Sequence, residues 1–265
     1  MSLQEYSKNI REKSNEYSEV LAAIKVLLKS EIGSESLKYL QTRVSNYNIE
    51  KFDFGYFPKS DELRHLYKYV NKDALMSLRL VSDWQDNNSR QTGISNKSYF
   101  NYHNIVFPSR DEYGNIIGLI GRTILSPIEI KNLKQPKYKY TYFSKSEHLF
   151  GLNLAKRSIE KKNYAILVEG QIDCISCHSR GYHNVVALGG SSLGDYQTFL
   201  LKKYTDTIYL LLDNDVAGEK AANKIIKTYS QDINIKKLRL PSQYNDVDEY
   251  LNKSSDYRIF ERLNS

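Results

Sequence analysis

Residues 165–169 read AILVE, residues 184–190 read NVVALGG, and residues 208–215 read IYLLLDND. Each stretch begins with a short apolar run, and a fourth run follows at 235–240. Helical patterns separate the runs, over 172–180, 193–201 and 217–229, with a short helix at 247–252. Continuous apolar runs are typical of strands that are covered on both faces. The alternation of such strands with helices predicts an α/β fold with a parallel sheet and crossover helices.

The preceding part of the chain has a different pattern. Apolar residues at three- and four-residue spacing predict an amphipathic helix over 14–30, closed by Gly33. The other expected elements are a helix at 36–43, a broken helical stretch at 59–82, a loop at 83–97, strands at 104–108, 116–124 and 137–143, and a helix at 149–159. The turn signal at 111–115 makes the first two strands a hairpin. We therefore expect a mixed α+β lobe before the parallel sheet.

The predicted domains follow from this change of pattern. They are an N-terminal helical segment (1–36), an α+β lobe (37–160), the parallel-sheet domain (161–253) and a C-terminal tail (254–265).

Composition sets limits on the class of protein. The 265 residues are 40% hydrophobic and 26% charged, which is typical of a folded chain and not of a disordered one. Lys plus Arg exceed Asp plus Glu by 38 to 31, and the net charge of +7 is compatible with a nucleic-acid partner. Two cysteines exclude a disulfide framework. No apolar run is long enough to span a membrane, and the first residues do not resemble a signal peptide, so we expect a cytoplasmic protein without a membrane partner.

Acidic side chains follow three of the four predicted strands. They are Glu169, Asp173, Asp213, Asp215, Asp246 and Asp248. Because the carboxyl ends of parallel strands meet at one edge of a sheet, we expect these carboxylates to lie together. Their mutual repulsion would be relieved by a divalent cation, and oxygen ligands suit Mg²⁺ or Mn²⁺. Any one of them is equally well explained as a helix N-cap, but the whole set favours a metal site.

The residues 165–225 resemble the TOPRIM domain of bacterial DnaG-type primases, a Rossmann-like parallel sheet with helices on both faces. The family pattern has Glu-Gly, an Asp four residues after that Glu, a central glycine turn and DxDxxG. The matching residues here are Glu169–Gly170, Asp173, Gly189–Gly190, Asp213, Asp215 and Gly218. The stretch 240–251, LPSQYNDVDEYL, is similar to the late LPxGxDPDEYL element and contributes Asp246 and Asp248.

Three upstream stretches resemble primases specifically, and not other TOPRIM proteins. They are LKYLQTRVSNYNIEKFDFGYFP (37–58), NIVFPSRDEYGNIIGLIGRTI (104–124) and PKYKYTYFSKSEHLFGL (136–152). The resemblance covers about residues 10 to 252. It implies a two-lobed catalytic core, a nucleotidyltransferase that synthesises short RNA primers on a single-stranded DNA template from NTPs.

The resemblance also implies roles for individual residues. Glu169, Asp213 and Asp215 would hold the catalytic Mg²⁺ or Mn²⁺ ions, with Asp173, Asp246 and Asp248 in support. The ions would help to deprotonate the primer's 3′ hydroxyl and would clamp the triphosphate. Four basic residues match family positions near nucleotide and template. They are Arg110, Arg122, Lys137 and Lys145.

The chain departs from the family in several places. The N-terminal zinc ribbon is missing, and no zinc is expected, since Cys174 and Cys177 are interpreted as packed core thiols. NYHN at 101–104 replaces basic residues, with His103 as the candidate substitute. The family's helical third lobe and helicase-binding region are also missing. A replicative helicase or a separate zinc-module protein therefore remains an open choice of partner.

Two other functions stay open from the sequence. One is a TOPRIM nuclease that cuts DNA with a divalent metal and needs no NTP. The other is a non-catalytic primase-accessory subunit that binds single-stranded DNA. A topoisomerase would need a further large domain with a tyrosine nucleophile, for which the chain has no room.

Overall fold

The computed structural model describes residues 3–84, 95–254 and 260, and side chains over 8–83, 96–254 and 260. The chain divides into two compact units. Unit 1 comprises Met1–Thr42, Ile49–Ser109 and Asn115–Phe143, and unit 2 comprises Arg43–Asn48, Arg110–Gly114 and Ser144–Ser265. In this division residues 144–160 belong to unit 2, whereas the sequence grouped them with the first lobe. The predicted tail at 254–265 lies almost entirely outside the described residues.

The described residues from 3 to 140 form helices and short strands, most of which belong to unit 1. The helices are α1 (Leu3–Leu28), α2 (Ser34–Gln41), α3 (Asn46–Lys51), α4 (Lys72–Ser77) and α5 (Pro127–Asn132), with 3-10 turns at Glu31–Gly33 and Ser60–Lys68. The strands are β1 (Gly55–Tyr56), β2 (Val81–Trp84), β3 (Ser95–Ser98), β4 (Ile105–Arg110), β5 (Ile116–Arg122) and β6 (Tyr138–Tyr140).

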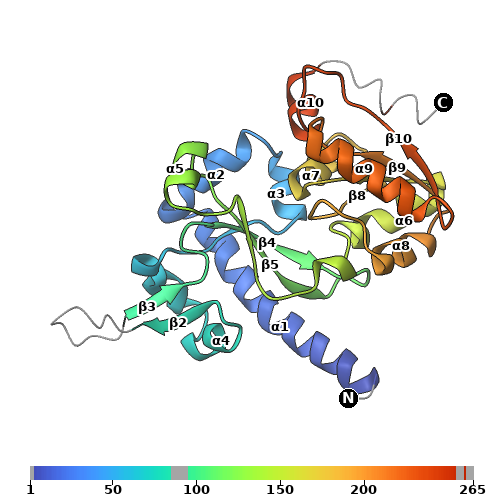
Figure 1. Cartoon of the computed structure of the whole chain (residues 1–265). Coiled ribbons are helices and arrows are strands. Elements are labelled where there is room, and N and C mark those ends of the chain that lie inside the picture. Colours follow the sequence, from blue (N-terminus) through green and yellow to red (C-terminus); the bar gives the residue numbers. More distant parts are fainter. Residues whose placement is uncertain (1–2, 85–94, 255–259, 261–265) are drawn as a thin grey trace. The chain divides into compact units, whose positions relative to one another are not determined.

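The sheet of unit 1 has the order β1-β4-β5-β6. The long helix α1 packs against β1 and β5 (Figure 1), and its apolar stripe, with Tyr17, Val20 and Ile24 each at most 1% exposed, supplies the core. Gly55 allows this close packing, because a Cβ there would lie 2.3 Å from a side-chain carbon of Ile24. The helix therefore packs on the strand that ends at the candidate basic residue Arg122, whereas Lys137 precedes β6.

Unit 2 alternates strands and helices as the sequence predicts. Its elements after the 3-10 turn Lys145–Glu147 are α6 (Leu152–Lys162), β7 (Ala165–Val168), α7 (Gln171–Ser179), β8 (Val185–Ala187), α8 (Asp195–Lys202), β9 (Thr207–Leu211), α9 (Val216–Tyr229), β10 (Asn234–Lys237) and α10 (Val247–Lys253).

The sheet of unit 2 is parallel, with the order β10-β9-β7-β8. Buried residues of α6, α8 and α9 form one core cluster with Leu167, Val186 and Leu210 of the strands. The helices α7 and α10 contact each other. Because the two central strands β7 and β9 are parallel, their carboxyl ends, after Val168 and Leu211, lie at the same edge.

The predicted α/β fold is confirmed, and most predicted elements occur within a few residues of their expected bounds. The exceptions have physical reasons. The last strand β10 was expected to be a continuous apolar run, but its residues alternate between exposed and half-buried, because it is an edge strand with two lysines. The polar stretch interpreted as a loop contains parts of β2 and β3, which pair with each other. Residues 85–94 of that stretch lie outside the described residues. No helix in the described part of the chain is long and apolar enough to cross a membrane.

The turn between β4 and β5, residues 110–114, belongs to unit 2. The buried carboxylate of Glu112 connects it to other residues of that unit. Glu112 is 7% exposed, accepts hydrogen bonds from Lys203 Nζ at 2.8 Å and from the Tyr204 hydroxyl at 2.6 Å, and its backbone oxygen accepts one from Lys156 at 2.7 Å. Burial opposes ionisation of Glu112, but the hydrogen bonds from Lys203 and Tyr204 outweigh it and lower its pKa. The turn is therefore fixed to α6 and to the end of α8.

Glu112→Gln should lower the free energy of unfolding at pH 7 by about 1–2 kcal/mol, because the hydrogen bonds lose their charge assistance. A lowered pKa contributes stability above the ordinary value of 4.5, and this contribution is lost as the pH falls through the folded-state pKa. The difference between the two proteins in urea unfolding should therefore shrink below about pH 4.5. Glu160→Gln, on the exposed side of α6, is the control and should change stability little. A pH-independent difference for Glu112→Gln would contradict this account.

Candidate active site

Glu169, Asp213 and Asp215 come shortly after β7 or β9, whereas Asp246 and Asp248 come after the edge strand β10, at the start of α10. Glu169 comes directly after β7, and Asp213 and Asp215 come two and four residues after the end of β9. Glu169 is half-buried, and burial, followed by the negative charge of Asp215, raises its pKa. The structure therefore places Glu169 and Asp215 within electrostatic reach of each other, although 46 positions (215 − 169) separate them in the sequence.

Asp173 lies in the first turn of α7 and is 7% exposed. Its Oδ2 accepts a hydrogen bond from the Gly170 backbone N–H at 3.1 Å, and its Oδ1 accepts one from the Asp248 N–H at 2.9 Å. Burial, followed by the charges of Asp246 and Asp213, raises the pKa of Asp173 to about 8. The structure therefore places Asp213 and Asp246 close enough to Asp173 for their charges to oppose its ionisation.

Asp248 is buried and fully engaged by its own neighbours. Its Oδ2 accepts a hydrogen bond from Arg43 at 2.5 Å, and its Oδ1 accepts bonds from the Ser176 hydroxyl at 2.5 Å and the Asn252 amide at 2.7 Å. The Asp248 carboxylate thus joins α10 to α7 and to the segment that begins at Arg43. Because these donors occupy both oxygens, Asp248 is suited to position Asp173.

Arg43 is a partner of the acidic residue Asp248 that the sequence analysis did not single out. It lies 205 positions from Asp248, so no local pattern links the two. The primase-like stretch 37–58 contains this arginine, but the resemblance assigned it no role.

The N-cap interpretation also describes part of the acidic set. Oδ1 of Asp215 accepts a hydrogen bond from Gly218 N–H at 2.7 Å, and Oδ1 of Asp246 accepts one from Glu249 N–H at 2.7 Å. Each bond uses one carboxylate oxygen. Capping therefore fixes the orientation of these two side chains at the starts of α9 and α10, and does not by itself exclude a second ligand on the other oxygen.

Gly218 is required by a close approach of the backbone. A Cβ at this position would lie 2.2 Å from the carbonyl oxygen of Asp213, closer than any real contact. The DxDxxG spacing therefore has a geometric cause: the glycine lets α9 begin immediately beside the strand-end Asp213.

These carboxylates fit a hard divalent cation by their chemistry, since all of them are oxygen donors whose mutual repulsion a cation would relieve. The structure brings Glu169 near Asp215, and Asp173 near Asp213 and Asp246. Within the described residues, no three His, Cys, Asp or Glu side chains are grouped so that they could hold a metal ion. The metal-ligand assignment therefore stays a prediction.

The four predicted basic residues differ in their surroundings. Arg122 is 4% exposed, and its guanidinium donates hydrogen bonds to the hydroxyls of Tyr39 and Tyr138. Arg110 donates to the Gly114 carbonyl at 2.8 Å. Lys137 Nζ lies 5.9 Å from the Tyr138 ring centroid, and burial lowers the pKa of Lys145. Arg122 and Lys137 belong to unit 1, and Arg110 and Lys145 to unit 2.

Two other predictions concern neutral groups. Cys174 and Cys177 are both fully buried, and Cys174 Sγ lies 3.4 Å from the Val185 carbonyl oxygen, as expected for packed thiols. His103 is 1% exposed, its Nε2 lies 2.8 Å from the Pro136 carbonyl oxygen, and burial lowers its pKa. His103 is therefore not an exposed cation that could replace the basic residues of the family.

Two family descriptions match this chain. Residues 23–156 match "DNA primase catalytic core, N-terminal domain", and residues 166–251 match "Toprim-like". The two matches divide the chain near the point where the sequence pattern changes. Together they cover both the α+β lobe and the parallel sheet with its acidic edge.

Individual relatives agree. A DNA primase of Aquifex aeolicus is 33% identical over 241 residues, which are 90% of this chain and 46% of that protein. A solved structure of the zinc-binding and RNA polymerase domains of the Aquifex aeolicus primase has a TM-score of 0.72 at 31% identity, covering 94% of this chain and 61% of that one. A DnaG primase catalytic domain solved with ssDNA has a TM-score of 0.71 at 22% identity, with coverage of 95% and 82%, which shows a shared fold. This chain thus spans less than half of its full-length relative, and it belongs to the DnaG-type DNA primase catalytic-core family.

Proposed function

We propose that this chain is the catalytic core of a DNA primase, a nucleotidyltransferase that synthesises short RNA primers on single-stranded DNA. The observation that supports it is the acidic edge of unit 2, where burial, followed by the charges of Asp246 and Asp213, raises the pKa of Asp173. The residues of the acidic edge are Glu169, Asp173, Asp213, Asp215, Asp246 and Asp248. A protein that only bound DNA would gain nothing from mutually repelling carboxylates. The relatives of this chain that are named as DNA primases support the same function.

The residues of the acidic edge divide into two roles. Glu169, Asp213 and Asp215, with Asp246, would hold Mg²⁺ or Mn²⁺. Asp173 and Asp248 would position them, because both oxygens of each already accept hydrogen bonds from the protein. When bound, divalent ions would lower the pKa of the attacking hydroxyl and neutralise triphosphate charge.

The basic residues would contact phosphates of the NTP and the template. Arg110, Lys137 and Lys145 are the proposed contacts. The neighbouring phenols outweigh the effect of burial and raise the pKa of Arg122, so it stays a cation inside unit 1. We propose that Arg122 supports the strand β6, because it pairs with Tyr138 of that strand and donates a hydrogen bond to the Tyr138 hydroxyl.

The test is incubation with single-stranded DNA, labelled NTPs and Mg²⁺ or Mn²⁺, followed by sizing of the products. The proposal expects short labelled RNA that requires template, NTPs and metal together. Shortened DNA without NTPs would identify a nuclease instead. Tight binding of DNA without either product would identify an accessory subunit. A replicative helicase or a zinc-module protein can be added to the same reaction to test it as a partner.

A further inference from the structure

Three aromatic side chains of unit 2 are exposed near one another. Tyr113 is 77% exposed, Tyr196 is 47% exposed and Phe199 is 55% exposed. The rings of Tyr196 and Phe199 have centroids 5.7 Å apart. Tyr113 follows Glu112, whose carboxylate lies 2.8 Å from Lys203 Nζ, and Lys203 in turn lies against the Phe199 ring. We call Tyr113, Tyr196 and Phe199 the aromatic patch.

Lysines lie beside the rings of the aromatic patch. Lys203 Nζ is 4.9 Å from the centroid of Phe199, and Lys156 Nζ is 5.9 Å from that of Tyr113. Lys203 is held there by Glu112 at 2.8 Å. The next lysine, Lys202, is exposed. Two of the three exposed rings therefore have an amine within 6 Å, and the buried Glu112 holds one of these amines, Lys203, in place.

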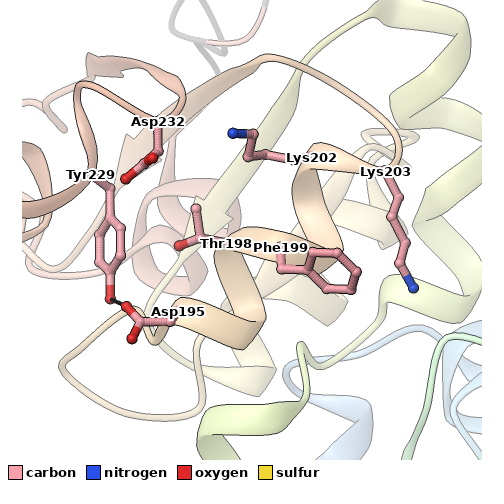
Figure 2. A pocket seen from close by; sticks show the side chains of 7 residues that line it. All are labelled: Asp195, Thr198, Phe199, Lys202, Lys203, Tyr229 and Asp232. Carbon is pink, nitrogen blue, oxygen red and sulfur yellow. Dashed lines mark hydrogen bonds between the residues drawn. The ribbon is translucent and has the colours of Figure 1, made fainter.

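A cavity of about 490 Å³ adjoins the patch between α8 and the end of α9. Figure 2 shows its lining side chains, Asp195, Thr198, Phe199, Lys202, Lys203, Tyr229 and Asp232. The Tyr229 hydroxyl donates to Asp195 at 2.7 Å and so holds one wall of the cavity (Figure 2). A volume of this size lies in the range of sites for small organic groups, and a nucleotide is such a group.

We propose that the aromatic patch and this cavity form a subsite for single-stranded nucleic acid, with unpaired bases stacked on Phe199 and Tyr196. Single-strand binding surfaces combine aromatic platforms with cations that contact the backbone. The core of a protein–protein interface is instead depleted of lysine, whereas lysines accompany the exposed rings here. The inference rests on the proposed function for its ligand class.

The charges of the subsite indicate how it binds. Glu112 compensates Lys203, and Asp195 and Asp232 line the cavity, so stacking contributes more than contact with phosphates. Lys202 and Lys203 both line the cavity, but Lys203 is paired with Glu112. Lys202, which is exposed, is therefore the lysine that we expect to contact a phosphate. Its replacement by glutamine should therefore reduce the salt dependence of binding by no more than about one phosphate, a slope change of about 0.7.

The test measures binding of a fluorescent 20-nucleotide single strand, as DNA and as RNA of the same sequence, without NTPs or divalent metal. Phe199→Ala should weaken binding about 5- to 10-fold, within the range of one lost base stack. Phe199→Trp should restore it and Phe199→Leu should not, because leucine replaces the apolar volume but not the stacking face. If Phe199→Ala weakens binding of the DNA strand more, the subsite takes the template. If it weakens binding of the RNA strand more, the subsite takes the primer.

Tyr69→Ala is the matched control, since Tyr69 is 55% exposed, as Phe199 is, but lies in unit 1. It should leave binding unchanged. Unchanged affinity in Phe199→Ala, or full affinity in Phe199→Leu, would overturn the proposal and leave the patch as a protein-binding surface. Because the assay requires no catalysis, a chain that fails to make primers could still confirm this subsite, and an active primase could still refute it.

Discussion

Asp213→Asn should reduce primer synthesis by two orders of magnitude or more, roughly the cost of removing a main electrostatic group from an active site. Asp213 follows β9 at the acidic edge, and its negative charge contributes to the raised pKa of Asp173. Asparagine keeps the shape and removes the charge, so the loss would come from weaker metal and triphosphate binding. Rates are measured with labelled NTPs on single-stranded DNA.

Asp213→Asn should also change how the melting temperature responds to Mg²⁺, which can be measured without an activity assay. Without metal, Asp213→Asn should not lower the melting temperature, because it relieves repulsion among carboxylates. Added Mg²⁺ should raise the melting temperature of the wild type, since a ligand that binds only the folded state stabilises it, and should raise that of the variant less. A variant with normal rates and a normal response to Mg²⁺ would exclude Asp213 from the site.

Asp206→Asn is the matched control for this experiment. Asp206 precedes β9 and is exposed, whereas Asp213 follows the same strand. The two residues therefore lie at opposite ends of one strand. Only the residue at the carboxyl end should affect catalysis.

Asp248→Ala should lower the free energy of unfolding by about 2–3 kcal/mol, because it leaves Arg43, Ser176 and Asn252 without their acceptor. Loss of the α7–α10 connection should also reduce primer synthesis, since the Asp248 N–H holds Asp173. Urea unfolding measures the first effect and the template assay the second.

A double-mutant cycle with Arg43→Ala isolates the ion pair. We expect a coupling energy of about 1 kcal/mol or more, as for residues in one hydrogen-bonded network. Lys253→Ala is the control on the same helix, because its pair with Glu249 is exposed at Lys253 and spans only four residues. That pair should contribute about 0.3–0.5 kcal/mol. If Asp248→Ala costs no more than Lys253→Ala, the buried network does not stabilise the site.

Much of unit 2 could be predicted from local sequence. AILV at 165–168 forms β7 with the expected bounds, because a strand covered on both faces needs an unbroken apolar run. Glu169 and Asp213 could be placed at one edge because parallel strands leave no other arrangement for residues at their carboxyl ends. The short strand β1 and the helix α5 were not predicted, since two-residue strands and a helix with no buried residue have no apolar period.

The parallel-sheet fold and the family could be read from the sequence alone, and the grouping of carboxylates at one edge of the sheet is a prediction from it. Only the tertiary structure decided which carboxylates are engaged by the protein, because the partners of Asp248 come from α7, α10 and a segment 205 positions away. It also decided that Arg122 and His103 are buried and that Phe199 is exposed. The reason is that local periodicity records which face of an element is apolar, whereas burial and pairing of a polar side chain depend on elements that meet it only after folding.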